Sequence, residues 1–144
     1  MLATASKPQE KLAWHAQPRQ RDFLVRLEDE VLYGGAAGGG KSDALIIWLI
    51  TRAFQYPGSR GIYFRRTFAD LARADAALDR SKVLLYGPAK YNDQDHRWTF
   101  SNGSTLDFGY LEHDNDKYRY HSAQYDSIAF DELTQFAESQ YLYL

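Results

Sequence analysis

The most informative stretch of this sequence is Gly35-Ala36-Ala37-Gly38-Gly39-Gly40-Lys41-Ser42, which fits the spacing G-x-x-x-x-G-K-[ST] without a gap. The glycines permit backbone angles closed to other residues, so that successive N–H groups converge on phosphate oxygens. We predict that this loop binds a nucleotide, that Lys41 reaches its β and γ phosphates, and that the Ser42 hydroxyl ligates Mg²⁺. The alternative is a chance glycine-rich turn, and the sequence on either side of the loop argues against it.

Apolar segments flank the loop on both sides. Residues 30–33 (EVLY) precede it with the composition of a strand, and the apolar residues 43–54 follow it as a predicted buried helix, which Pro57-Gly58 ends. A helix that starts at the loop presents its unpaired N–H groups and its positive dipole end to a phosphate. The order strand, loop and helix therefore favours phosphate binding.

A second motif follows another apolar segment, Ser127-Ile128-Ala129-Phe130, which leads directly into Asp131 and Glu132. If this strand emerges beside the phosphate loop, Asp131 can hold Mg²⁺ through water and Glu132 can polarise the attacking water. A solvated acidic pair at a helix start is the alternative interpretation, since acids favour the positive end of a helix dipole. Beside a complete phosphate loop, the pair predicts hydrolysis of the nucleotide.

Weaker signals lie elsewhere in the chain. Gln20 follows Pro18 on the first turn of a predicted helix, where its amide can pair with the edge of an adenine; a solvated glutamine is the ordinary alternative. Arg65, Arg66 and Arg119 can each meet phosphate charge, in the same chain or from a neighbouring subunit, although surface arginines are common. The four histidines show no spacing typical of metal ligands.

The remaining pattern alternates strands with helices. Residues 61–64 and 127–130 are predicted strands, while residues 19–28 and 67–78 are predicted helices, the second with Thr67 as its N-cap. This alternation predicts an α/β fold with a mostly parallel sheet.

A predicted hairpin surrounds Asn102-Gly103. A two-residue turn would pair Trp98 with Asp107 and mix apolar and polar residues on each face. A three-residue loop with Gly103 in the left-handed region instead pairs Trp98 with Leu106, which places the apolar side chains on one face. Because a slip of one residue turns every side chain over, we predict the three-residue loop.

Composition limits the class of protein. The chain has 144 residues with 44% apolar and 25% charged residues, a formal net charge of −2 and no cysteine. These values predict one globular domain at most and exclude a disulfide scaffold or a cysteine-ligated metal site. Neither a signal peptide nor an apolar run long enough to cross a membrane is evident, so we expect a soluble, cytoplasmic protein. We divide the chain into an N-terminal arm, residues 1–16, and a domain, residues 17–144.

The motifs together resemble the N-terminal ATPase domain of the large terminase subunit of tailed bacteriophages. The matching pieces, which extend from about residue 17 to residue 136, are QPRQRDFL, VLYGGAAGGGKSDALI, IYFRRTFADL, WTFSNGSTLDFGYLE and YHSAQYDSIAFDELTQF. The resemblance implies a P-loop NTPase of the additional-strand (ASCE, RecA-like) type that uses ATP and Mg²⁺ to package double-stranded DNA into procapsids. It also implies a homo-oligomeric ring that works with the portal protein and the small terminase subunit in the host cytoplasm.

The resemblance assigns roles to single residues. It implies that Gln20 reads the adenine, that the loop from Gly35 to Ser42 holds the phosphates, and that Lys41 is catalytic. Ser42 and Asp131 would be the magnesium residues, and Glu132 the catalytic carboxylate.

Two departures from the family pattern stand out. Many members carry an arginine inside the phosphate loop, where this chain has Ala36, Ala37, Gly38 and Gly39. The family also continues beyond the equivalent of Leu144 with a coupling strand, which normally lies between the loop strand and the acidic strand, and with a nuclease domain. Two other functions therefore stay open: another nucleic-acid-dependent ATPase, such as a helicase, or an inactive truncated fragment that binds nucleotide.

Overall fold

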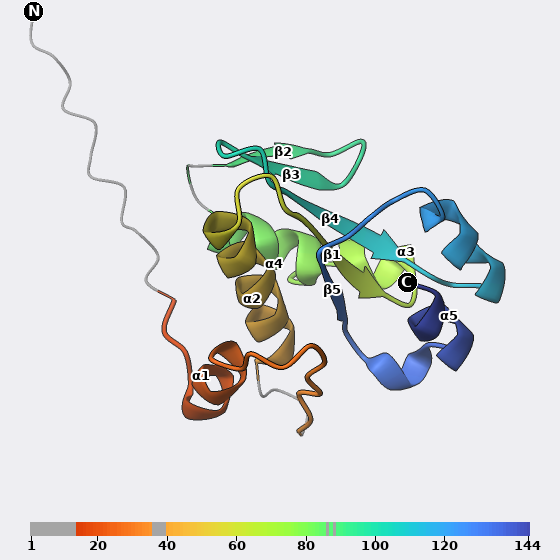
Figure 1. Cartoon of the computed structure of the whole chain (residues 1–144), viewed down its shortest axis with the longest axis horizontal. Helices are drawn as coiled ribbons and strands as arrows, with labels where there is room; N and C mark the ends of the chain where they lie inside the picture. The colour runs from red at the N-terminus through yellow and green to blue at the C-terminus, as the bar shows by residue number, and fades with distance from the viewer. Residues whose placement is uncertain (1–13, 36–39, 86, 88) are drawn as a thin grey trace, which may run out of the picture.

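A five-stranded mixed sheet forms the centre of the computed structural model, which describes residues 14–35, 40–85, 87 and 89–144 (Figure 1). In the order β2-β3-β4-β1-β5, the strands are Ala89–Asn92, Arg97–Phe100, Thr105–Tyr110, Arg60–Arg65 and Ser127–Phe130. β1 pairs in parallel with β4 and β5, whereas β3 pairs antiparallel with β2 and β4. The α/β class is confirmed, and the prediction of a mostly parallel sheet is wrong.

The antiparallel part of the sheet comes from two short connections, which reverse the chain before and after β3. The strand β2 was not predicted, because its short sequence AKYN buries no side chain fully and carries little β-branched or aromatic character. The hairpin between β3 and β4 has the predicted register: Trp98 pairs with Leu106, and Gly103 has φ of 84°. Its apolar side chains share one buried face, as predicted: Trp98, Phe100, Leu106 and Phe108.

The helical segments are α1 (Pro18–Leu24), α2 (Lys41–Gln55), α3 (Phe68–Ala72), α4 (Ala77–Leu84) and α5 (Glu138–Tyr143), with 3-10 turns η1 (Asp114–Tyr120) and η2 (Leu133–Gln135). In Figure 1, α2 and α4 lie on one side of β1 and β5, and the C-terminal segments lie on the other. α2 confirms the predicted helix after the loop. It buries one face rather than its whole circumference, since Phe54 is 48% exposed.

Successive side chains of β1 point to opposite faces of the sheet. Tyr63 belongs to the larger apolar cluster, which α2 and α4 cover. Ile62 and Phe64 belong to a second cluster around Leu111, together with residues of β5 and of the C-terminal segments. All three β1 side chains are fully buried, so the strand is held rigidly on both faces.

Two predicted elements before α2 differ in the structure. The first helix ends at Leu24, four residues before the predicted end at residue 28, and Leu27 beyond it is 95% exposed. Residues 30–33 join no strand of the described sheet, so the predicted strand there is wrong. An extended segment needs a neighbouring strand for its backbone hydrogen bonds, and among the described residues none lies beside it. Tyr33 instead stacks on Phe23, with ring centroids 5.1 Å apart.

The predicted helix over residues 67–78 is two short helices, α3 and α4. Thr67 caps the first as predicted, because its Oγ1 accepts a hydrogen bond from the Asp70 N–H at 3.1 Å. The chain then turns at Asp75, whose φ of 59° lies in the left-handed region and cannot continue a helix. The predicted single helix is thus interrupted at this turn.

Candidate functional site

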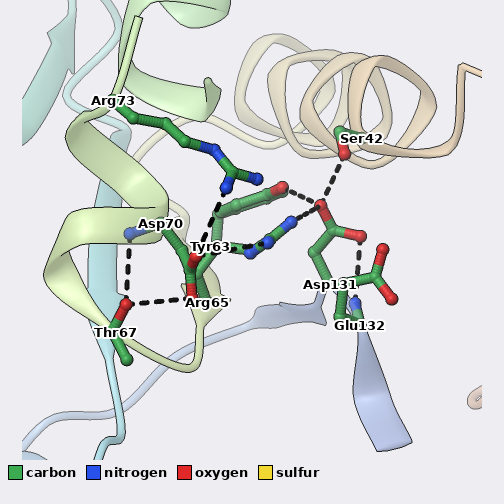
Figure 2. A network of polar contacts seen from close by, with 8 residues as sticks. All are labelled: Ser42, Tyr63, Arg65, Thr67, Asp70, Arg73, Asp131 and Glu132. Carbon is green, nitrogen blue, oxygen red and sulfur yellow. Dashed lines mark hydrogen bonds and ion pairs between the residues drawn. The ribbon is translucent and has the colours of Figure 1, made fainter. Parts of the chain in front are cut away.

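Asp131 lies at the carboxyl end of β5 and is the centre of a polar network (Figure 2). Its side chain is 4% exposed. Ser42, in the first turn of α2, donates its hydroxyl hydrogen bond to Asp131 Oδ2 at 2.5 Å. The structure therefore brings together a hydroxyl and a carboxylate that are 89 residues apart in the sequence.

Two further donors to Asp131 Oδ2 come from β1. The hydroxyl of the fully buried Tyr63 donates to it, and Arg65 Nη1 does so at 3.2 Å. Burial and the neighbouring charge of Asp131 both raise the pKa of Tyr63 well above its ordinary value, so the phenol stays a donor. Burial lowers the pKa of Arg65, but the charges of Asp131, Tyr63 and Asp70 and the hydrogen bond to Asp131 together outweigh burial, so the pKa is raised. Both side chains reach Asp131 because β1 and β5 are parallel neighbours whose carboxyl ends coincide.

The network continues from Arg65 to a second carboxylate. Asp70 Oδ1 lies 3.9 Å from Arg65 Nη2 and 3.7 Å from Nη1 of the exposed Arg73. Thr67 Oγ1 donates to Asp70 Oδ2 at 2.9 Å, which fixes this carboxylate at the start of α3. The Arg65 guanidinium thus lies between two carboxylates, and it contacts Asp131 more closely than Asp70 (Figure 2).

Glu132 differs from its neighbour. Its side chain is exposed, and within the described part of the chain its carboxylate has no hydrogen-bond donor or cation in contact. Its backbone lies in the left-handed region, with φ of 56° and ψ of 54°, and its N–H donates to Asp131 Oδ1 at 3.0 Å. Such a conformation is uncommon for a residue with a Cβ, and Asp75 and His96 are the other described non-glycine residues with positive φ. Asp131 is thus held in place by hydrogen bonds, whereas the carboxylate of Glu132 is accessible to solvent.

The structure describes only the two ends of the glycine-rich loop. Ala36, Ala37, Gly38 and Gly39 lie outside the described residues. Gly40 is the N-cap of α2, with φ of 66°, and Lys41 is the first residue of that helix. Lys41 Nζ donates to the carbonyl oxygen of Gly35 at 2.6 Å, so the ends of the loop are in contact with each other.

Gln20 lies against the same end of α2. Its Nε2 donates to the Gly40 carbonyl oxygen at 2.8 Å, and its Oε1 accepts from the Gln17 N–H at 2.8 Å. The side chain is nearly buried, with 3% of the residue exposed. Among the described residues, one N–H and one oxygen lone pair of Gln20 remain for another partner, since an amide has two donors and two acceptor sites.

Only one of the three candidate arginines lies at the site. Arg66 donates to the backbone carbonyl oxygens of Glu112 and Gln135. Arg119 donates to the Tyr110 carbonyl oxygen at 2.8 Å and stacks on the Tyr110 ring. Arg65 is therefore the candidate that this chain places next to Asp131.

The donor set suits Mg²⁺. A hydroxyl and a carboxylate in direct contact are hard oxygen ligands, and Mg²⁺ is ordinarily held by one or two carboxylates together with phosphates of the substrate. Among the described residues, no group of three or more histidines or acids that could hold a metal on its own is present. The described residues therefore suit a cation that binds together with a nucleotide. They are less suited to holding a metal ion with protein ligands alone.

Sequence reasoning missed Tyr63 and Asp70. Tyr63 lies in the predicted strand of residues 61–64, where an aromatic residue is ordinary. The sequence does place Tyr63 two residues before Arg65, and alternate residues of a strand share a face. This spacing is the signal that could have placed Tyr63 beside Arg65 in the site. Asp70 lies three residues after the predicted cap Thr67, and only the tertiary structure shows that it faces Arg65.

Comparison with known protein families now identifies the class. Residues 32–144, which are more than half of the chain, match the family described as "Terminase large subunit, T4likevirus-type, N-terminal". The chain belongs to this family, and a terminase role in phage DNA packaging is supported. No curated protein and no solved structure matches the chain significantly. Within the described residues, no helix has the length and apolar character needed to cross a membrane.

Proposed function

We propose that this site binds ATP with Mg²⁺ and hydrolyses it to drive double-stranded DNA into a procapsid. The contact between Ser42 and Asp131 is the observation that carries the proposal, because it joins the end of the glycine-rich loop to the acidic strand. Membership of the terminase large-subunit family agrees with it. The P-loop fold type of the additional-strand class is part of the same proposal.

Each residue of the site has a proposed role that follows from its position. The loop from Gly35 to Ser42 binds the phosphates, with the dipole of α2 and Lys41 supplying positive charge. Ser42 and Asp131 hold Mg²⁺, which would neutralise charge on the phosphates when it is bound. Glu132 orients the attacking water and accepts its proton, a role that needs an accessible carboxylate. Gln20 reads the adenine with the donor and acceptor that its contacts leave open.

In the packaging machine, we propose that copies of the domain, residues 17–144, form a ring at the portal protein in the host cytoplasm, with the small terminase subunit as a further partner. The net charge of −2 provides no broad basic surface for DNA. DNA would therefore be bound by a local patch on the assembled ring.

The test is the substitution Glu132→Gln, which keeps the size of the side chain and removes its basicity. We expect phosphate release from ATP to fall by about 100-fold or more, as for the loss of a general base, with ATP binding retained. The exposed Glu112→Gln removes the same charge about 20 residues away in the sequence and should leave the rate unchanged.

Three outcomes separate the functions that the sequence left open. Equal rates for wild type and Glu132→Gln would show that Glu132 is not the base. A wild-type protein that binds ATP and releases no phosphate would support the inactive nucleotide-binding fragment. Hydrolysis that single-stranded nucleic acid stimulates more than double-stranded DNA would favour the helicase-like alternative.

A further inference from the structure

The carboxylate of Asp131 is already occupied by donors from the protein. Oδ2 accepts hydrogen bonds from Ser42, Tyr63 and Arg65, and Oδ1 accepts the N–H of Glu132. A carboxylate has about four lone-pair sites in all, two on each oxygen. Oδ2 therefore has more donors than lone-pair sites, while Oδ1 keeps one site without a donor among the described residues. A cation at this carboxylate lies beside the Arg65 guanidinium, so like-charge repulsion opposes its binding as long as Arg65 stays in place.

The three donors differ in how easily they can leave. Tyr63 is 0% exposed and packed in the main apolar cluster, so its hydroxyl has nowhere to move. Ser42 can keep donating its hydrogen while an oxygen lone pair binds a cation. Arg65 makes the longest of the three contacts, 3.2 Å, and its positive charge repels a divalent cation.

Arg65 also has a second carboxylate to which it can move. Asp70 Oδ1 lies 3.9 Å from Nη2, which is an ion pair too long for a hydrogen bond. In addition, the buried Nε of Arg65 has no hydrogen-bond acceptor among the described residues. The guanidinium is thus incompletely bonded in its present position, with a fixed anion beside it.

We propose that Arg65 is an exchangeable counter-ion: it neutralises Asp131 in the absence of metal, and it moves to Asp70 when a divalent cation with nucleotide binds at Ser42 and Asp131. Arg65 is then a positioning residue, because it acts through the carboxylate. Asp70 is the acceptor that lowers the cost of its release. The inference rests on the proposed function, since it needs a divalent cation to bind at this site.

The test measures binding of Mn²⁺, as a paramagnetic substitute for Mg²⁺, to the ADP-loaded protein by the electron paramagnetic resonance signal of free Mn²⁺. Arg65→Gln removes the competing cation, so we expect Mn²⁺ to bind about tenfold more tightly. Asp70→Asn removes the acceptor for Arg65, so we expect Mn²⁺ to bind several-fold more weakly. Arg66→Gln changes the net charge equally, one residue away, and contacts only backbone carbonyls in the described structure; it should change the dissociation constant less than twofold.

A second measurement uses the wild-type protein and does not depend on how the variants fold. The Nε–H resonance of Arg65, assigned by its loss in Arg65→Lys, should shift when Mg²⁺ is added to the ADP complex. It should stay in place when ADP is added with a chelator.

The outcomes distinguish the two proposals. If wild-type protein with ADP binds no Mn²⁺, both the proposed function and this inference fail. If it binds Mn²⁺ but Arg65→Gln and Asp70→Asn shift affinity in the same direction, or the Arg65 resonance does not respond to Mg²⁺, the exchange alone is overturned. Opposite shifts in the two variants, together with the resonance change, support it.

Discussion

The carboxyl ends of β1 and β5 and the segment before α2 both contribute to the candidate site, yet they are built differently. At the strand ends, Asp131, Tyr63 and Arg65 are largely buried and linked to one another. In the segment of residues 25–35, Leu27 and Leu32 are 95% and 80% exposed. The strand ends are therefore held by their neighbours, whereas residues 25–35 make few packing contacts with the other described residues.

The contrast between the two regions shows which contacts stabilise the site. Parallel strands supply backbone hydrogen bonds and two packed faces, so polar side chains at their ends can be oriented before any ligand binds. The segment before the glycine-rich loop has the same apolar composition as a strand, but it joins no ladder in the described structure. The side chains at the strand ends are therefore held in place by the fold itself, and three substitutions can test the contrast with residues 25–35.

The largest effect is expected for Asp131→Ala. The substitution leaves the Arg65 guanidinium, whose side chain is 11% exposed, without its closest counter-charge. Breaking such a pair costs about 3–5 kcal/mol of unfolding free energy. Urea denaturation measures it, with the adjacent exposed Glu132→Ala as the control, expected within about 0.5 kcal/mol of wild type. Equal losses for both acids would remove the distinction between a held and an accessible carboxylate.

An intermediate effect is expected for Gly40→Ala, at the junction of the two regions. Gly40 has φ of 66°, and a Cβ there would lie 2.3 Å from Gln20 Nε2. Left-handed backbone strain and a disturbed hydrogen bond together predict a loss of about 1–2 kcal/mol in unfolding free energy. Gly34→Ala, where a Cβ meets nothing within 4 Å, is the matched control and should be close to neutral. If Gly40→Ala leaves the unfolding free energy unchanged, the hydrogen bond from Gln20 does not stabilise the packing of α1 against α2.

The smallest effect is expected for Leu32→Ala. Because Leu32 is 80% exposed, the unfolding free energy should change by no more than about 0.5 kcal/mol. The same substitution at the fully buried Leu106 should cost about 2–5 kcal/mol. A large loss at Leu32, measured in the same urea series, would show that the segment is packed in solution and would weaken the contrast between the two regions.

Much of the fold was predictable where local signals and burial agree. The hairpin register followed from the alternation of Trp98 and Phe100 with polar residues, because only one register buries both with Leu106. α2 and the strands β1 and β5 followed from strongly apolar runs. By contrast, residues 30–33 have strand composition and form no strand, because a strand exists only with a partner beside it.

The candidate site was predictable as a set of residue types and not as a set of contacts. Ser42 and Asp131 were each predicted to hold metal, and the structure shows that they touch. The contribution of Tyr63 could not be predicted, since a tyrosine in a buried strand has no pattern that distinguishes a packing residue from a hydrogen-bond donor. The metal-binding and catalytic roles themselves stay predictions.

The sequence by itself determined the glycine-rich loop, the acidic strand end, the hairpin register and the α/β class, because each depends on residues close together along the chain. Only the tertiary structure decided that the sheet is mixed and that Arg65, rather than Arg66 or Arg119, lies beside Asp131. Those features depend on which strands become neighbours, and strand order is set by packing over the whole domain. The arrangement of Arg65 between Asp131 and Asp70 is therefore a property of the fold, which no local pattern contains.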